Sequence, residues 1–163
     1  MPGQSRGTCA PLDAFNTASA ESARQTLLGC LHSLRWAARI EAHRPYPDLP
    51  SLLAAADEAA YDLTPGDVTE ALTQESLPEL PDGTYEVAHT ALNAAYAAYE
   101  ARFGHVFVIH VNDTSPDEAL DHVLTAIRSR LTNDPEDERQ VTAEELRRLA
   151  KGRLMELLRG AGP

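Results

Sequence analysis

The sequence has too few cysteines for a protein held together by disulfides or by zinc. Only Cys9 and Cys30 occur among its 163 residues, whereas a disulfide framework or a zinc finger needs several paired cysteines. The six histidines are scattered, and no two of them have the spacing of a known ligand motif such as His-Glu-x-x-His. We therefore expect no metal site.

Basic residues and long apolar runs are also scarce. Fourteen lysines and arginines stand against 25 acidic residues, which gives a net charge of −11. A protein that binds duplex nucleic acid needs a basic face to displace counterions, so we expect no nucleic-acid partner. No run of 18 apolar residues predicts a membrane span. The first residues lack an apolar segment of signal-peptide length, so we expect a cytoplasmic protein with no membrane partner.

The residues that are present predict a chain of helices. Good helix formers dominate from Phe15 onward, and apolar side chains recur at helical spacing. Thr64-Pro65, Ser115-Pro116 and Asp134-Pro135 each place a capping side chain before a proline, which is typical of a helix start. The predicted helices cover residues 18–42, 50–61, 65–74, 84–102, 116–132 and 135–159.

One segment has a different pattern. Residues 106–111 are apolar and mostly β-branched, and they follow Gly104, which fits the position just after a helix. A single strand would have no partner, so we expect a short buried extended segment threaded between helices. Residues 1–14 lack periodicity and predict a flexible tail. Residues 15–160 then form a single all-α helical domain.

The residues alone leave the function open. Glycine-rich phosphate loops are absent. Cys30 lies among leucines in a predicted helix, where a cysteine is usually a small apolar packing residue. The acidic cluster at 134–138 predicts a solvated helix start. His110 is the histidine of most interest, because it lies inside the apolar segment, where a buried imidazole has a shifted pKa, a polar partner or both.

Several blocks, taken in order along residues 15–158, carry a resemblance. They are Phe15-Asn16, Cys30-x-x-Ser33-x-x-Trp36, Arg44-Pro45-Tyr46, residues 52–57, residues 98–109, Arg130-Leu131-x-Asn133-Asp134-Pro135-Glu136 and Arg153-Leu154. In this order they resemble the 2-oxo-4-hydroxy-4-carboxy-5-ureidoimidazoline (OHCU) decarboxylase family. The resemblance implies a compact helical homodimer without a cofactor, which acts on a small-molecule substrate late in urate breakdown and yields (S)-allantoin.

The implied chemistry defines the residues to look for. Loss of CO₂ leaves negative charge on the ring, which is delocalised and then protonated from one face. Such a reaction needs a general acid or base and a cation or hydrogen-bond donors for the carboxylate and ureido groups. By resemblance, Arg153 near the C-terminus is a catalytic residue. The residues that would line the substrate pocket are Phe103, Gly104, Phe107, Ile109 and His110.

The sequence departs from the family at the acid/base position. The family has a His-Pro motif after Glu-Ala-Leu, whereas this chain has Glu75 at the histidine's place and no His-Pro anywhere. Glu79 matches the glutamate of the family's Ser-x-x-Glu-Gln motif. Glu75 and Glu79 are therefore predicted to be catalytic with Arg153. A carboxylate is normally ionised at pH 7 and repels an anionic substrate, so His105 or His110 is an alternative acid/base group.

Three functions remain open at this point. The first is the family's decarboxylation with an altered acid/base group. The second is a different small-molecule reaction on the same scaffold, in a biosynthetic pathway for example. The third is binding of a small molecule without catalysis. Fold alone does not decide between them, because function depends on the site.

Overall fold

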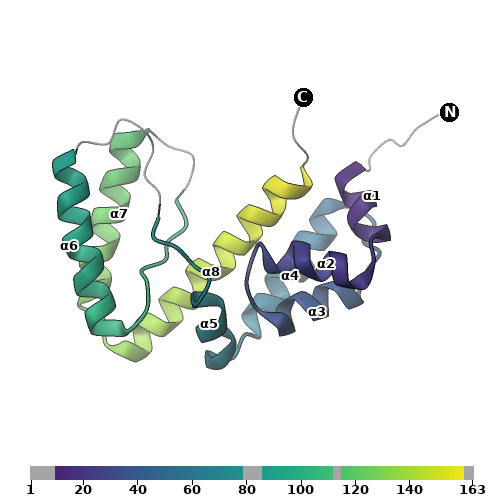
Figure 1. The fold of residues 1–163 in the computed structure, drawn as a ribbon, viewed down its shortest axis with the longest axis horizontal. Helices are drawn as coiled ribbons and strands as arrows, with labels where there is room; N and C mark the ends of the chain where they lie inside the picture. Colours follow the sequence, from purple (N-terminus) through teal and green to yellow (C-terminus); the bar gives the residue numbers. More distant parts are fainter. Residues whose placement is uncertain (1–9, 79–85, 112–114, 160–163) are drawn as a thin grey trace. The chain divides into compact units, whose positions relative to one another are not determined.

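The structure is a computed structural model that describes residues 10–78, 86–111 and 115–159. Over these residues the chain forms α-helices, labelled α1 to α8, and no β-strand (Figure 1). The predicted all-α class is confirmed. None of the helices described is long and apolar enough to cross a membrane. The chain divides into two compact units, and the division falls inside α8, between Leu146 and Arg147.

The first unit contains residues 1–71 and 147–163. Its helices are α1 (Ala10–Thr17), α2 (Ala20–Leu28), α3 (Leu34–Ala42), α4 (Leu49–Tyr61), nearly all of α5 (Pro65–Leu72) and the second half of α8 (Pro135–Leu158). Helix α3 packs against both α2 and α4. The Trp36 indole is buried and donates a hydrogen bond to the Ala56 carbonyl at 3.1 Å. Other large buried side chains are Leu27, Leu31, Ile40, Leu52 and Leu154.

The N-terminal part of this unit differs from the prediction in two places. The helix predicted over 18–42 is two helices, because the chain leaves the helix at Gly29 and starts again after Ser33. The Ser33 hydroxyl accepts a hydrogen bond from the Trp36 N–H at 3.2 Å, so it caps α3. In addition, α1 begins at Ala10, within the segment predicted to be a tail. Leu12 and Phe15 are buried, which explains why this segment is helical.

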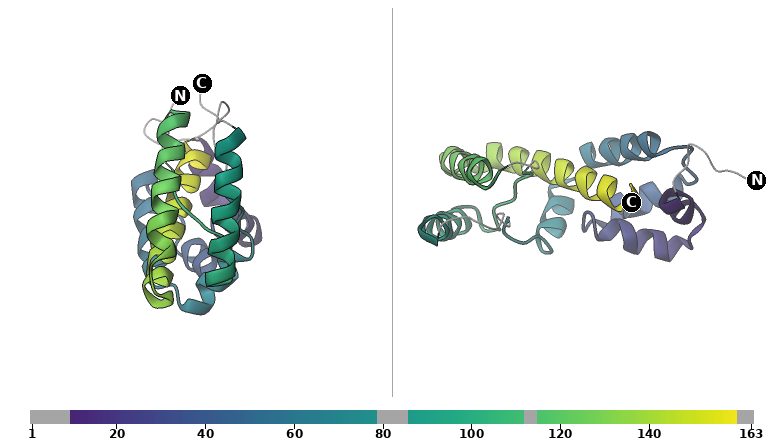
Figure 2. Two further views of the ribbon diagram at one scale, coloured as in Figure 1. Left: turned by 90° about the vertical axis from the view of Figure 1, so that its left-hand side faces the viewer. Right: turned by 90° about the horizontal axis from the view of Figure 1, so that it is seen from above.

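The second unit contains residues 72–146. It is formed by α6 (Glu86–Phe103), α7 (Pro116–Leu131) and the first half of α8. Helices α6 and α7 pack side by side (Figure 2). Ser115 starts α7 with the capping box that the sequence predicts. Apart from the break at 29–33, the observed helix ends lie within two residues of the predicted ones wherever the structure describes them.

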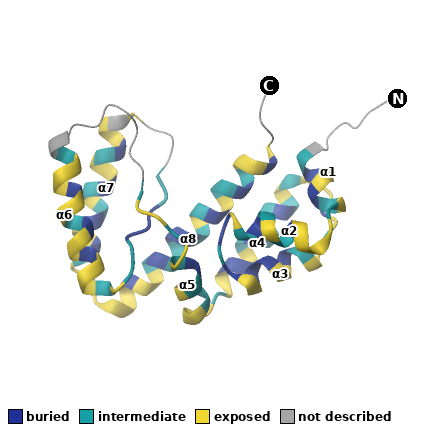
Figure 3. Cartoon of the chain, viewed as in Figure 1, coloured by how far each residue is buried: buried dark blue, intermediate teal, exposed yellow. Residues whose placement is uncertain are grey.

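The extended segment at 106–111 is confirmed. It has neither helix nor strand, and Phe107, Val108 and Ile109 at its centre are buried (Figure 3). Gly104 turns the chain out of α6 with a φ of +84°, a conformation that favours glycine. The Gly104 N–H also closes α6 by donating to the Glu100 carbonyl at 2.8 Å. A single domain over residues 15–160 stays a prediction.

Candidate functional site

Arg153 lies in the first unit, on the second half of α8. Its guanidinium is partly exposed, and its Nη1 donates a hydrogen bond to the Cys30 carbonyl at 3.1 Å. Cys30 belongs to the loop of residues 29–33 that joins α2 to α3, and we call this segment the 29–33 loop. The predicted catalytic arginine is therefore held against the loop that contains the Cys30-x-x-Ser33 motif.

The Cys30 thiol shares this environment but is not suited to nucleophilic chemistry. Burial raises the pKa of the thiol to about 11, and the nearby positive charge of Arg153 only partly opposes that rise. The thiol is consequently protonated at neutral pH, whereas a nucleophilic cysteine must be a thiolate. The structure agrees with the sequence-based view that Cys30 is a packing residue.

The opposite end of the 29–33 loop contacts a carboxylate. The Leu34 N–H at the start of α3 donates a hydrogen bond to Glu70 Oε2 on α5 at 3.2 Å. Both Glu70 and Arg153 are intermediate in exposure. A positive and a negative side chain, from α8 and α5, thus hold the two ends of one short loop. His32 is the residue between them whose side chain is not buried.

Of the two predicted catalytic glutamates, the structure describes Glu75 and not Glu79. Glu75 lies three residues beyond the end of α5, and its N–H donates to the Leu72 carbonyl at 3.2 Å. Its side chain is intermediate in exposure. Glu79 lies outside the described residues. A shared site for Glu75, Glu79 and Arg153 stays a prediction.

The predicted pocket-lining residues lie in the second unit, and most of them are packing residues. Phe107 is fully buried, and Ile109 is 6% exposed. Both belong to a hydrophobic cluster with α6 and α7, and Phe103 packs against this cluster. The Phe107 and Tyr99 rings meet edge to face with centroids 5.1 Å apart. Their role in substrate binding stays a prediction, whereas their role in the core is plain.

The polar contact found at His110 is made by its backbone, so it does not test the prediction for a buried imidazole. The His110 N–H donates a hydrogen bond to Glu145 Oε1 at 2.7 Å, and the Glu145 side chain is almost buried on α8. The His110 side chain is partly exposed. The His105 side chain has partners within the protein. Its Nδ1 lies 2.8 Å from the Val106 carbonyl, and its ring packs edge to face with Tyr99.

Sequence reasoning missed a buried ionic network in the second unit. Glu138 lies in the acidic cluster that predicted a solvated helix start, but its side chain is fully buried. Arg130 Nε donates to Glu138 Oε2 at 2.7 Å, and Arg130 Nη1 donates to the Val108 carbonyl at 2.7 Å. The Tyr99 hydroxyl also donates to Glu138. Burial, reinforced by this hydrogen bond, raises the pKa of Tyr99 to about 12.

This network explains one block of the family resemblance in structural terms. Arg130 ties α7 to α8 and to the backbone of the extended segment, and its guanidinium lies over the Phe107 ring at 4.3 Å from the centroid. The Asn133 side chain donates a further hydrogen bond to Glu138 at 3.0 Å. These groups satisfy one another, which is the requirement for a buried charge. Their arrangement supports the fold of the second unit.

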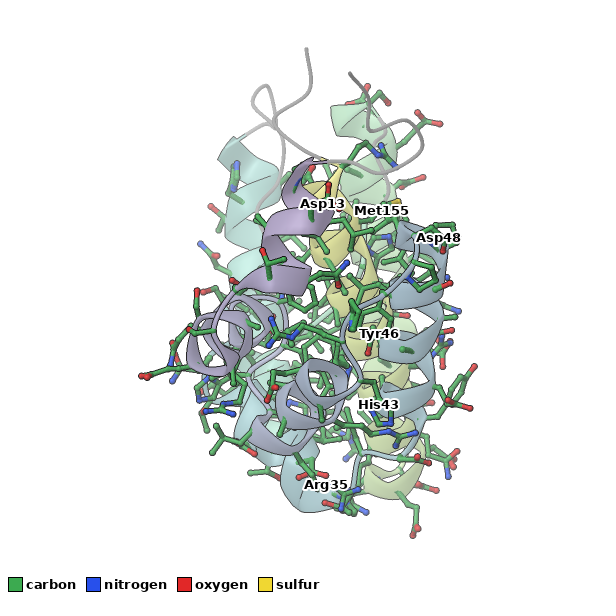
Figure 4. The ribbon with its side chains drawn as sticks, turned by 90° about the vertical axis from the view of Figure 1, so that its right-hand side faces the viewer. Asp13, Arg35, His43, Tyr46, Asp48 and Met155 are labelled. Atoms are coloured by element: carbon green, nitrogen blue, oxygen red, sulfur yellow. The ribbon has the colours of Figure 1, made fainter. Side chains whose placement is uncertain are left out.

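A second block of the resemblance is structural as well. The Asn16 side chain exchanges two hydrogen bonds, both of 2.9 Å, with the backbone N–H and carbonyl of Tyr46. Arg44 Nη1 donates to the Phe15 and Ala18 carbonyls at 2.7 Å each. These bonds fix α1 to the segment after α3, where Tyr46 and His43 are labelled in Figure 4. The motifs at 15–16 and 44–46 are therefore joined by hydrogen bonds.

Metal-binding groups do not gather in the part of the chain that the structure describes, where no three His, Cys, Asp or Glu side chains are grouped for a metal ion. The chemistry available at Arg153 is recognition of an anion by a guanidinium, at a loop that also carries the partly exposed His32 and is followed by the Leu34 N–H bonded to Glu70. Sequence analysis missed His32 and Glu70, because it placed 29–33 inside one long helix. Gly29 and Ser33 were the available signals of a break.

The comparisons with known proteins identify a family from the sequence and a shared fold from the structure. The family model described as OHCU decarboxylase matches residues 16–82 and 80–155. A crystal structure of OHCU decarboxylase in the presence of (S)-allantoin has a TM-score of 0.72 at 18% identity, over 87% of this chain and 99% of that one. A crystal structure of (S)-allantoin synthase has a TM-score of 0.68 at 19% identity, over 90% of this chain.

The last of these matches is partial, since the chain spans about half, 53%, of the length of the (S)-allantoin synthase. At identities below 20% both structural matches show a shared fold. No curated protein matches the chain in sequence.

Proposed function

Because the chain belongs to the OHCU decarboxylase family, we propose that it is a cofactor-independent carboxy-lyase. Its substrate is a small heterocycle that carries a carboxylate and a ureido group. OHCU itself is the first candidate, which would place the protein in urate breakdown with (S)-allantoin as product. The single observation that carries this proposal is the family match over nearly the whole described chain, and Arg153 at the 29–33 loop supports it.

Arg153 supplies the charge that this chemistry needs. A guanidinium recognises a carboxylate with two parallel hydrogen bonds and keeps its charge at any physiological pH. In the reaction the bond between the ring carbon and the carboxylate breaks, CO₂ leaves, and the electron pair stays on the ring. One proton then adds to the ring from one face. A cation beside the ring stabilises the negative charge that develops on it.

The other site residues are part of the proposal. Glu75 and Glu79 are proposed to face the substrate, where carboxylate oxygens accept hydrogen bonds from ureido N–H groups. Phe103, Gly104, Phe107, Ile109 and His110 are proposed to be substrate-binding residues. We further propose that two copies of the chain pair as a homodimer, as the resemblance implies. Light scattering on the purified protein checks this, with twice the 17.7 kDa of one chain expected.

One observation favours a second candidate function. The chain has glutamate at position 75 and contains no His-Pro dipeptide, so we infer that the histidine of the family is replaced here. A changed proton carrier suits a different substrate on the same scaffold. In that case the protein binds a related carboxylated heterocycle and does not accelerate the loss of CO₂ from OHCU.

The rate of CO₂ release from freshly generated OHCU separates these candidates. The purified protein is added to OHCU, and CO₂ release is compared with spontaneous decay in the same buffer. We expect release to increase in proportion to protein concentration and to depend on Arg153. Arg148→Met is the matched control, since Arg148 is an exposed arginine on the same helix. Release no faster than the spontaneous rate at any protein concentration excludes OHCU decarboxylation and leaves the second candidate.

A further inference from the structure

His32 occupies an unusual place in the 29–33 loop. Cys30, Leu31 and Ser33 are all buried, so His32 is the residue in this stretch whose side chain reaches the surface. The Ser33 N–H donates to the Leu31 carbonyl at 2.8 Å, which encloses His32 in a tight turn. The loop backbone is therefore held in place while the imidazole stays accessible.

Within the described residues, the His32 ring has no side-chain interaction. None of the hydrogen bonds, ion pairs or ring contacts found in the described part of the chain involves this ring. By contrast, the Nδ1 of His43 lies 2.8 Å from the Arg39 carbonyl, and the Nδ1 of His105 lies 2.8 Å from the Val106 carbonyl. His89 and His122 are exposed on α6 and α7. His32 alone of the six lies on the loop that Arg153 contacts.

The charges around the loop suit a proton donor. Arg153 on α8 bonds to the loop at Cys30, and Glu70 on α5 bonds to Leu34 at its other end. The Cys30 thiol is protonated and adds no charge, while Arg35 on α3 is paired with Asp67 at 3.5 Å. A substrate carboxylate bound by Arg153 would lie against the loop that carries His32.

We propose that His32 is the group that protonates the ring after CO₂ has left, in place of the family's missing histidine. This inference rests on the proposed function. The bond to CO₂ breaks with its electron pair left on the ring, the His32 imidazolium gives one proton to the ring, and the neutral imidazole regains a proton from water. An imidazolium attracts the anionic substrate, whereas the carboxylate of Glu75 repels it.

The kinetic test compares His32→Gln with Glu75→Gln and with His122→Gln, a matched exposed histidine. We expect His32→Gln to lower kcat/KM for OHCU by about 10²- to 10⁴-fold, the usual contribution of a general acid. His122→Gln keeps the wild-type rate, and Glu75→Gln lowers the rate less than His32→Gln does.

A binding experiment on the wild-type protein tests the role of His32 even if the His32→Gln variant does not fold. Histidine ring signals are recorded by NMR while (S)-allantoin, used as the probe, is added. We expect the His32 signal to move and the His122 signal to stay, and we expect Arg153→Met to abolish the response.

The results distinguish this inference from the function on which it rests. If the wild type decarboxylates OHCU while folded His32→Gln stays within about a factor of three of it, His32 is not the donor and the function stands. A His32 signal that is unmoved while other signals respond to allantoin overturns the inference in the same way. A wild type with no activity and no response to allantoin overturns both.

Discussion

Arg130 and Arg153 both belong to sequence blocks shared with the family, but their surroundings differ. Arg130 is buried. Its guanidinium donates hydrogen bonds to Glu138 and to the Val108 carbonyl, and it lies over the Phe107 ring. Arg153 is partly exposed, and one of its contacts is a hydrogen bond to the backbone carbonyl of Cys30 in the 29–33 loop. A buried arginine paired with a carboxylate supports a fold, whereas we propose that the partly exposed arginine on α8 meets a substrate anion.

The comparison indicates that some residues of the motifs stabilise the fold, whereas others are available for chemistry. The Arg130 network and the pair formed by Asn16 and Tyr46 are closed within the protein. The 29–33 loop is held at both ends but presents His32 outward. Substitutions in the two regions should therefore separate stability from activity.

The largest effect is expected for Arg130→Met. Removing one partner leaves Glu138 buried without its counter-charge, which costs about 3–5 kcal/mol of unfolding free energy. Urea denaturation followed by circular dichroism measures the loss. The double variant Arg130→Met with Glu138→Met is the control, and it should recover much of the stability because both charges are gone. A single variant as stable as wild type would show that the network does not support the second unit.

Arg153→Met, unlike Arg130→Met, should reduce activity more than stability. We expect kcat/KM for OHCU to fall by about 10²-fold, because a donor to the developing charge is lost. The unfolding free energy should fall by less than in Arg130→Met, because Arg153 is only partly buried and Arg130 is buried. Arg148→Met, measured in parallel, should leave kcat/KM unchanged. Equal losses of stability in Arg153→Met and Arg130→Met would remove the distinction between the two arginines.

The two regions should also differ in alkaline solution. The folded-state pKa of Cys30 is raised from 9.0 to about 11, so the thiol's contribution is fully present below pH 9 and is lost as pH rises toward 11. The slope approaches roughly 1.4 kcal/mol per pH unit. The corresponding loss from Tyr99 begins near pH 10, since its pKa is raised from 10.0 to about 12. Denaturation curves at pH 8, 9 and 10 test this, and Cys30→Ala should flatten the decline between pH 9 and 10.

The smallest effect is expected for Gly104→Ala. A Cβ at this position would meet no atom within 4 Å, so the cost comes from the positive φ alone and amounts to about 1 kcal/mol. Thermal unfolding measures this cost. The KM for OHCU, measured on the same variant, shows whether a substrate approaches this turn, as the resemblance implies. A rise in KM supports that role, and an unchanged KM contradicts it.

Most of the fold followed from local signals in the sequence. Thr64-Pro65 and Ser115-Pro116 mark helix starts by a mechanism confined to four residues, and both starts were predicted correctly. The break at 29–33 was missed because its neighbours are strong helix formers, and the Ser33 cap was read as part of a helix. Glu138 was misplaced because its burial depends on Arg130 and Tyr99, which belong to other helices.

The candidate site followed from the sequence only in part. Arg153 was identified by resemblance, but its contact is the backbone carbonyl of Cys30, 123 residues away, which no side-chain pattern reveals. The prediction for Glu75 rests on an aligned position and stays a prediction. His32 lies inside a quoted motif, between Cys30 and Ser33, yet its accessibility became visible only when the loop was seen to be held at both ends.

The most direct test of the proposed function is the handedness of the allantoin formed from OHCU in the presence of excess protein, measured by chiral chromatography after complete conversion. A site that holds the ring at Arg153 and adds the proton from one side predicts a single enantiomer, the (S) form. An equal mixture of the two enantiomers would contradict the account, because the proton would then have been added without control by the protein.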